Sequence, residues 1–387
     1  MKVPVNNEIL KWAREELNLS YNEVASRMKK SESVILAWEN GDDQPTYAQL
    51  EKLAYEVYKL PLAVFFFPEH PDIGNIQRSF RTIPDSEYNM LPTQIIKLFR
   101  KGEAYKENLK ELYDNKNYNY EKNIDELVKN KNNYKMLQIK LREILGISLE
   151  EQKGFQNSKV AFEKWRDAVE KLGIYVFKDA FKEDAFSGFC LYDEEFPIIY
   201  INNTMPINRQ IFTLFHEIYH IIFKTSGIDN RNEEKFINSL SGENQEIEIK
   251  CNMFAGDFLV PIDDFDIEIN GKSINEKEIT ELAELYCVSR EVILRKLYDK
   301  SLIDQFTYDE YSNKWIEEAK KNRNKKDGSG NYYNNVITYL GDNYLSKSFE
   351  KYNKGLITEY QLADYLNVKP NLIVPLENIL MRRWING

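Results

Sequence analysis

The five residues from His216 to His220 constrain this chain more than any other feature. They read His-Glu-Ile-Tyr-His and use two of the three histidines in the 387-residue sequence. Residues four apart lie on one face of a helix, so the motif predicts a helix whose two imidazoles bind one Zn²⁺. Glu217 lies just off that face, where it can reach a metal-bound water without being a ligand. The alternative is a chance pair of histidines, or a buried pair satisfied by hydrogen bonds.

A catalytic zinc ion usually has three protein ligands, so the motif requires a third one elsewhere. The best candidate is Glu248, within a predicted helix over residues 245–259. Glu248 lies on the inward side of the apolar stripe, whereas Glu246 lies on the polar side, and an inward carboxylate needs a partner such as a metal ion. Otherwise Glu248 is an ordinary helix-start carboxylate stabilised by the helix dipole. Weaker candidates for the third ligand are Glu233, Glu234 and Glu243.

Two motifs in this region match the pattern of a known family. Residues 212–220 read F-T-L-F-H-E-I-Y-H, and residues 248–255 read E-I-K-C-N-M-F-A, with L-V-P at 259–261. They resemble the ImmA/IrrE family of zinc metallopeptidases. The resemblance implies a gluzincin-like core in which the two motif histidines and the glutamate at 248 bind zinc, with Glu217 as catalytic base. Cys251 stands where the family usually has alanine, which leaves open oxidation or metal exchange at a sulfur near the metal.

The resemblance also implies a narrow substrate. The expected target is a partner repressor or antitoxin-like regulator, cleaved in a regulatory, stress or mobile-element response. Zinc would lower the pKa of a bound water to roughly 7 and polarise the scissile carbonyl. Glu217 would accept the proton of that water, and Tyr219, Tyr200 and Arg209 are candidates for stabilising the oxyanion. Two alternatives are a DNA-binding regulator or antitoxin-like partner with a structural metal site, and a scaffold that senses a ligand through its C-terminal domain.

The first 70 residues resemble the XRE family of helix-turn-helix regulators. The match rests on Ala25, Ile35 and the W-E-N-G segment at 38–41. This segment of the chain carries eight Lys/Arg and eleven Asp/Glu, whereas affinity for phosphate comes from basic residues. The predicted recognition helix also has no Arg, Asn or Gln for a bidentate base contact before Asn40. Both a DNA reader and a protein-docking or dimerisation module fit, so DNA and a second copy of the chain are candidate partners.

The predicted fold class is α+β, with a small β-sheet before the motif helix and helices almost everywhere else. Three strand-like runs lie within residues 173–201, where an edge strand could hold a substrate backbone, unless the run at 188–192 is interior. Residues 114–134, rich in Asn, Lys and Tyr, are predicted to form a loop or the tip of a helical hairpin. The predicted domains are a helix-turn-helix domain at 1–70, a helical linker at 71–157, a zinc metallopeptidase core at 158–265 and a helical C-terminal region at 266–387.

The C-terminal region contains two further segments with helix-turn-helix spacing, at residues 282–297 and 362–376. They are either additional DNA-reading units or a compact way to pack two helices, and packing is the commoner use of this spacing.

Composition favours a cytoplasmic protein without membrane spans or a secretory signal. At 42% hydrophobic and 13% aromatic residues, the chain can build substantial cores. Cys190, Cys251 and Cys287 are few and far apart, which suits a reducing compartment and excludes a cysteine-based zinc finger. The net charge of −10 argues against extensive coating of nucleic acid, though a local patch could still bind it.

Overall fold

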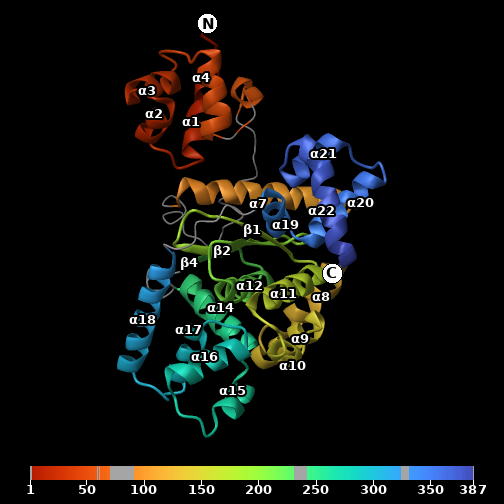
Figure 1. The fold of residues 1–387 in the computed structure, drawn as a ribbon. Coiled ribbons are helices and arrows are strands. Elements are labelled where there is room, and N and C mark those ends of the chain that lie inside the picture. Colours follow the sequence, from red (N-terminus) through yellow and green to blue (C-terminus); the bar gives the residue numbers. More distant parts are fainter. Residues whose placement is uncertain are drawn as a thin grey trace. The chain divides into compact units, whose positions relative to one another are not determined.

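The computed structural model describes residues 2–58, 60, 62–69, 91–230, 242–323 and 331–386. The chain divides into two compact units, residues 1–101 and 102–387, and the division falls within helix α7 (Thr93–Leu112) (Figure 1). Among the described helices, none is both long enough and apolar enough to cross a bilayer.

The first unit is helical, and its second and third helices form a helix-turn-helix. Ser20 and Glu23 make the predicted capping box at the start of α2, and Lys29 takes the left-handed conformation that ends it. Ala25 and Ile35 are buried, so the two helices pack through these small and branched side chains. The elements are α1 (Asn7–Glu15), α2 (Tyr21–Met28), α3 (Glu32–Asn40), α4 (Tyr47–Lys52), a π-helix (Leu53–Tyr58) and a 3₁₀-helix (Leu62–Phe66).

The second unit is built on a mixed sheet of four strands. Its order is β1-β3-β2-β4, with β1 parallel to β3 and the other two pairs antiparallel. The three predicted strands are confirmed, but the expectation that strands are confined to 173–201 is wrong, because β4 lies further along the chain. The strands are β1 (Tyr175–Asp179), β2 (Phe186–Leu191), β3 (Ile198–Asn202) and β4 (Ile228–Asn230).

The sheet is covered on both faces, because successive side chains point to opposite faces and nearly all of those in β1 to β3 are buried. On one face, Tyr105 of α7 stacks on Phe177 with ring centroids 4.5 Å apart, and Tyr200 lies in the same aromatic layer. On the other face, Ile199 and Ile201 join the core formed with α11 (Ser158–Leu172) and α12 (Ile207–Ile222) (Figure 1). The motif helix α12 therefore packs directly on the sheet.

Side chains of α11 occupy the outer edge of β1. The Val176 amide donates to Glu170 Oε1 at 3.3 Å, and Arg166 donates to the Val176 carbonyl. Arg166 also donates to the Thr338 carbonyl of α19 (Tyr332–Leu340) at 2.8 Å. At the centre of the sheet, β2 is paired on both sides, so residues 188–191 are interior. Among the strands that the structure describes, β4 is therefore the edge strand beside the motif helix.

Most of the Asn-rich segment, residues 114–134, is helical rather than a loop. It contains α8 (Tyr118–Asn130), which packs against α9 (Tyr134–Leu145), so the hairpin interpretation is the better one. Asn117 and Asn133 cap the two helices by accepting backbone amide protons, which explains why asparagine is compatible with helix here.

The helix-turn-helix turn occurs three times with the same hydrogen bond. A backbone amide donates to an alanine carbonyl at 2.9 Å from Lys30 to Ala25, from Val288 to Ala283 and from Val368 to Ala363. The second copy is the pair α16 (Glu276–Leu285) and α17 (Arg290–Asp299), and the third begins with α21 (Glu359–Leu366). The remaining helices are α10 (Leu149–Lys153), α14 (Glu243–Leu259), α15 (Ile262–Ile269), α18 (Gln305–Arg323), α20 (Asp342–Asn353), a 3₁₀-turn (Pro370–Leu372) and α22 (Ile373–Asn386).

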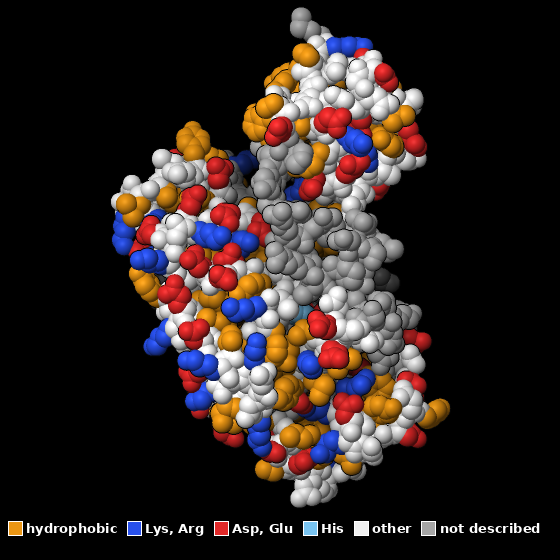
Figure 2. Space-filling view, turned by 180° about the vertical axis from the view of Figure 1, so that it is seen from behind, with side chains coloured by type: hydrophobic (Ala, Val, Ile, Leu, Met, Phe, Trp, Pro, Cys, Tyr) orange, Lys and Arg blue, Asp and Glu red, His pale blue; other side chains and the backbone are white. Residues whose placement is uncertain are grey.

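Ion pairs on α17 indicate that the second helix-turn-helix pair, α16 and α17, serves to pack helices rather than to bind DNA. Its cations are matched by carboxylates from neighbouring helices or its own next turn, which leaves less charge for phosphate. On the face drawn in Figure 2, basic and acidic side chains of the described residues are interspersed rather than gathered by sign. The pairs are Arg290 with Glu318, Arg295 with Asp299 and Lys296 with Asp257.

Candidate metal centre

Helix α12 places the two motif histidines side by side in the interior. His216 and His220 are 1% and 0% exposed, and their ring centroids lie 5.1 Å apart. The helix is buried along this length because the sheet covers one side and α14 covers another. The predicted helix with both imidazoles on one face is therefore present.

Helix α14 brings Glu248 to the same point. Its Oε2 lies 3.2 Å from His216 Nε2, and its Oε1 lies 3.2 Å from His220 Nε2. Glu246 is exposed, in agreement with the predicted orientation of the helix. Of the weaker candidates, Glu243 is exposed at the first residue of α14, whereas Glu233 and Glu234 lie outside the described residues.

The outer nitrogen of each imidazole has a hydrogen-bond partner that orients the ring. His216 Nδ1 lies 2.9 Å from Asn252 Oδ1, and His220 Nδ1 lies 3.0 Å from Thr225 Oγ1. The Thr225 hydroxyl donates its own proton to the His220 carbonyl at 3.1 Å, so it accepts from His220 Nδ1–H. In neutral imidazoles with this tautomer, both Nε2 lone pairs point inward.

These inward nitrogens are what a divalent cation requires. Neither Nε2 atom has a hydrogen-bond partner of acceptable geometry, although a carboxylate oxygen lies 3.2 Å from each. That spacing matches the edge of a tetrahedron around zinc, about 3.3 Å for ligand bonds near 2.0 Å. A lone pair facing a carboxylate oxygen is repulsive unless a proton or a metal ion lies between them, so the donor set fits a metal.

Charges around the centre reinforce this fit. Burial alone lowers the pKa of His216, but contact with Glu248 and the charges of Asp229 and Glu217 outweigh it and raise that pKa to about 10. Burial likewise raises the pKa of Glu248, but the two histidines outweigh it and hold that pKa well below its usual range. The pocket thus favours positive charge between its nitrogens and carboxylates, which a divalent cation supplies.

Glu217 lies beside this cluster and is 0% exposed. Neither carboxylate oxygen has a hydrogen bond of ordinary geometry, and the weakly donating Cys190 thiol interacts with this carboxylate. Burial raises the pKa of Glu217 to about 8, with His216 opposing the shift and Asp229 adding to it. A buried carboxylate with only a weak donor is costly to keep, so its presence here favours a chemical role.

Gly227, just before β4, lies against the inner nitrogen of His220. A Cβ built at this glycine would lie 2.5 Å from His220 Nε2, closer than real side chains come. Strand β4 is held there because the Cys190 amide donates to the Gly227 carbonyl at 3.1 Å. The edge of the sheet therefore passes directly beside the histidine cluster.

Asp229 of β4 is a buried carboxylate near the histidine cluster that the sequence did not reveal. It is 1% exposed and accepts from Arg209 at 2.8 and 3.0 Å and from Thr213 at 2.7 Å. Its carboxylate contributes to the pKa shifts of both His216 and Glu217. Asn252 and Thr225 were likewise given no role, although Asn252 lies within the second motif, four residues after the predicted glutamate ligand.

The three oxyanion candidates differ in where they lie. Tyr200 is wrong for this role, because it is fully buried on the sheet face covered by α7, opposite the histidines. Tyr219 is 3% exposed and stacks on Phe223 at 4.3 Å, as part of the core. Arg209 keeps 21% of its side chain exposed while bonded to Asp229 and is the candidate best placed to meet a substrate.

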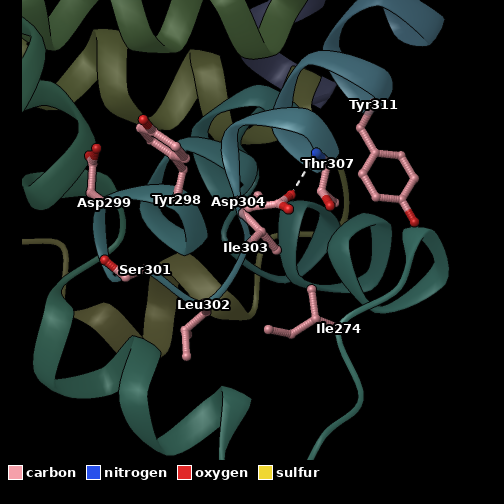
Figure 3. A pocket seen from close by; sticks show the side chains of 9 residues that line it. All are labelled: Ile274, Tyr298, Asp299, Ser301, Leu302, Ile303, Asp304, Thr307 and Tyr311. Atoms are coloured by element: carbon pink, nitrogen blue, oxygen red, sulfur yellow. Dashed lines mark hydrogen bonds between the residues drawn. The ribbon is translucent and has the colours of Figure 1, made fainter.

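A separate open hollow of about 890 Å³ is lined by Ile274, the end of α17, the loop after it and the start of α18 (Figure 3). Its polar groups are engaged in local structure: the Asp304 carboxylate accepts the Thr307 amide at 2.9 Å, and Asp299 pairs with Arg295. None of the residues of the histidine cluster lines it. The hollow therefore adds nothing to the chemistry of the histidine cluster. Its lining residues are Ile274, Tyr298, Asp299, Ser301, Leu302, Ile303, Asp304, Thr307 and Tyr311.

Two family models match the chain. Residues 169–298 match a peptidase family described as the IrrE N-terminal-like domain, and residues 10–61 match a helix-turn-helix family. The first match runs from the end of α11 through α17 and so contains the histidine cluster, β4 and the second helix-turn-helix pair. A comparison with curated proteins finds no match.

Proposed function

Because the chain joins an IrrE N-terminal-like peptidase domain to an N-terminal helix-turn-helix domain, we propose that it is a zinc metallopeptidase that cleaves a specific protein partner. The partner class is a repressor or antitoxin-like regulator. The observation that carries the proposal is the pair of inward, unpartnered Nε2 atoms converging on Glu248, with the fully buried Glu217 carboxylate next to them.

In this proposal His216, His220 and Glu248 hold the ion. Zinc bound there would supply a Lewis acid for the scissile carbonyl and a water of lowered pKa. Asn252 and Thr225 keep the two imidazoles in the tautomer that presents Nε2 to the ion. Glu217 accepts the proton of the attacking water and returns it to the leaving amine, a task suited to a carboxyl whose pKa burial raises to about 8.

The substrate chain would lie along β4. Within the described part of the chain, this strand pairs with β2 and is the outermost strand on its side of the sheet, and Gly227 brings the backbone just before it against His220. An extended peptide can add to such an edge through main-chain hydrogen bonds, which positions one peptide bond over the metal. Arg209, fixed by Asp229 but still part-exposed, would then contact a substrate carbonyl or carboxylate.

The N-terminal unit would locate the enzyme rather than perform chemistry. A helix-turn-helix fold supports DNA binding, and the same fold supports docking to a partner or to a second copy of the chain. Its α3 exposes Glu32, Ser33, Leu36 and Asn40, a face with one acidic side chain and no cation. We therefore favour protein docking, with DNA contacts limited to Lys29 and Lys30 at the turn.

The competing proposal is a regulator whose metal site is only structural. A structural site needs ligands but no base, so it gives no reason to keep a further carboxylate, that of Glu217, fully buried beside the ligands. The test is incubation of the zinc-loaded protein with the purified products of its neighbouring genes, followed by sequencing of any fragments. Cleavage that is lost in Glu217→Gln supports the peptidase. If the zinc-loaded protein leaves every candidate partner uncleaved, the result would instead favour a structural metal site.

A further inference from the structure

Cys251 lies in the histidine cluster together with Glu248. It is three residues further along α14, is 0% exposed, and faces α12 as Glu248 does. Its Sγ and one ring nitrogen of each of His216 and His220 all lie within 4.8 Å of one another. Helix α14 therefore directs two candidate donors, one carboxylate and one thiol, at the same pair of imidazoles.

The other nearby thiol, Cys190, already has partners, and it also interacts with Glu217. Cys190 accepts the Gly227 amide at 3.4 Å and lies 3.7 Å from the Thr225 carbonyl, so its sulfur is tied to the loop that precedes β4. Cys287 lies in the turn between α16 and α17, in the second helix-turn-helix pair. The geometry thus selects Cys251 as the thiol of the cluster.

The separations of the carboxylate and of the thiol from the two imidazoles each approach those around one ion. The nitrogen-to-oxygen separations of 3.2 Å already equal a tetrahedral edge around zinc. A sulfur donor needs nitrogen-to-sulfur separations of about 3.6 Å for ligand bonds near 2.3 and 2.0 Å. A thiol within 4.8 Å of both nitrogens reaches this distance by a small side-chain movement. Two helices can thus supply four donors, two from each.

We propose that Cys251 is a fourth metal ligand and that it holds the centre closed. This inference rests on the proposed metal site. Binding removes the thiol proton to solvent and forms a metal–sulfur bond, which gives a His₂GluCys set with no position left for water. When the thiolate leaves the ion and is reprotonated, a water takes the vacated position beside Glu217. Cys251 thereby regulates access of water to the metal.

Cobalt(II) substitution tests the metal–sulfur bond directly. A thiolate bound to cobalt(II) adds a charge-transfer band in the near ultraviolet, separate from the visible bands that report on bound cobalt. The wild type, Cys190→Ala and Cys287→Ala should show this band, whereas Cys251→Ala and Cys251→Ser should lose it and keep visible bands. Visible bands without the near-ultraviolet band in the wild type, or persistence of that band in Cys251→Ala, would overturn the inference.

Zinc affinity and cleavage should then change in opposite directions. Cys251→Ala removes a ligand, so its zinc affinity should fall by at least about tenfold, while it opens the fourth position and speeds cleavage of the partner. Unchanged affinity and unchanged cleavage would refute the closed centre. If no variant cleaves any partner but the cobalt band depends on Cys251, the proposed function fails and the thiol ligand stands. If cleavage occurs and neither the wild type nor any variant shows the band, the proposed function stands and the thiol ligand is refuted.

Discussion

The hydroxyl of Thr225 lies 3.0 Å from His220 Nδ1 and donates to the carbonyl oxygen of the same histidine at 3.1 Å. One small side chain therefore fixes both the orientation and the tautomer of a candidate ligand. Asn252 does the same for His216 from another helix. The ring orientation that a metal needs is thus built into the fold by bonds that do not touch the metal.

Removing the Thr225 hydroxyl should weaken metal binding without unfolding the protein. Thr225→Val leaves His220 free to rotate or to change tautomer, so zinc affinity should fall about 10- to 100-fold. Competition with a chromophoric chelator measures this. Thr280→Val is the matched control, because its hydroxyl also donates to a helix carbonyl, that of Glu276 at 2.8 Å, but lies outside the histidine cluster. Equal affinities for the two variants would contradict the proposed role of Thr225.

Adding one methyl group at Gly227 should disrupt the metal centre. The new Cβ would lie 2.5 Å from His220 Nε2, so either the histidine or β4 must move, and zinc affinity should fall at least about tenfold. Gly256→Ala on α14 is the control, since nothing lies within 4 Å of its Cβ position. Gly256→Ala should retain zinc and, because the position lies within a helix, raise the free energy of unfolding by about 0.5–1 kcal/mol. Full zinc content in Gly227→Ala would refute the close approach.

Arg166 should be the costliest charge to remove from α11. Its side chain is 3% exposed, pairs with Glu170 at 3.0 Å and joins β1 to α19. Arg166→Ala should therefore lower the free energy of unfolding by about 3–5 kcal/mol. Urea unfolding monitored by circular dichroism measures this. Lys171→Ala, which breaks the exposed pair with Asp167 on the same helix, should leave the midpoint nearly unchanged. Similar shifts for the two variants would show that the Arg166 bonds do not hold this edge.

DNA binding by the whole chain should be weak on random sequence. The exposed side chains of α3 offer no cation, so the dissociation constant for random duplex should be weaker than about 1 µM at about 150 mM salt. Replacing Lys29 and Lys30 with Glu should abolish what binding remains. Fluorescence anisotropy with a labelled duplex decides the matter. Submicromolar binding that survives this double change would contradict the assignment of α3 as a docking face.

The parts of the centre that lie on long helices could be predicted from the sequence, because a helical period repeats over several turns. The apolar stripe of α14 was enough to separate Glu248 from Glu246, and the structure puts the first inside and the second outside. Strands β1 to β3 were also recognisable from their apolar runs. Each of these signals extends over at least five residues.

What the sequence could not show depends on short or non-local contacts. Strand β4 has three residues, too few for an alternating pattern, so its Asp229 went unnoticed. Tyr200 was near in sequence to the motif but lies on the other face of the sheet, since strand alternation sends it toward α7. Thr225 looks like an ordinary loop residue until the end of α12 brings it back against His220.

The central claim is that Glu217 and Glu248 have separable roles, one in chemistry and one in holding the metal. Glu217→Gln keeps the size of the side chain but cannot accept a proton, so zinc should stay bound while cleavage falls by at least about 10²-fold. Glu248→Ala removes a ligand, so the zinc content itself should fall, and cleavage with it. Glu246→Ala, on the exposed side of the same helix, should change neither.

Elemental analysis of zinc in these three variants, alongside cleavage of the cognate partner, is the most direct test. The account predicts a zinc-loaded, inactive Glu217→Gln, a zinc-depleted Glu248→Ala and an unaltered Glu246→Ala. Full zinc content in Glu248→Ala, or undiminished cleavage by Glu217→Gln, would contradict it.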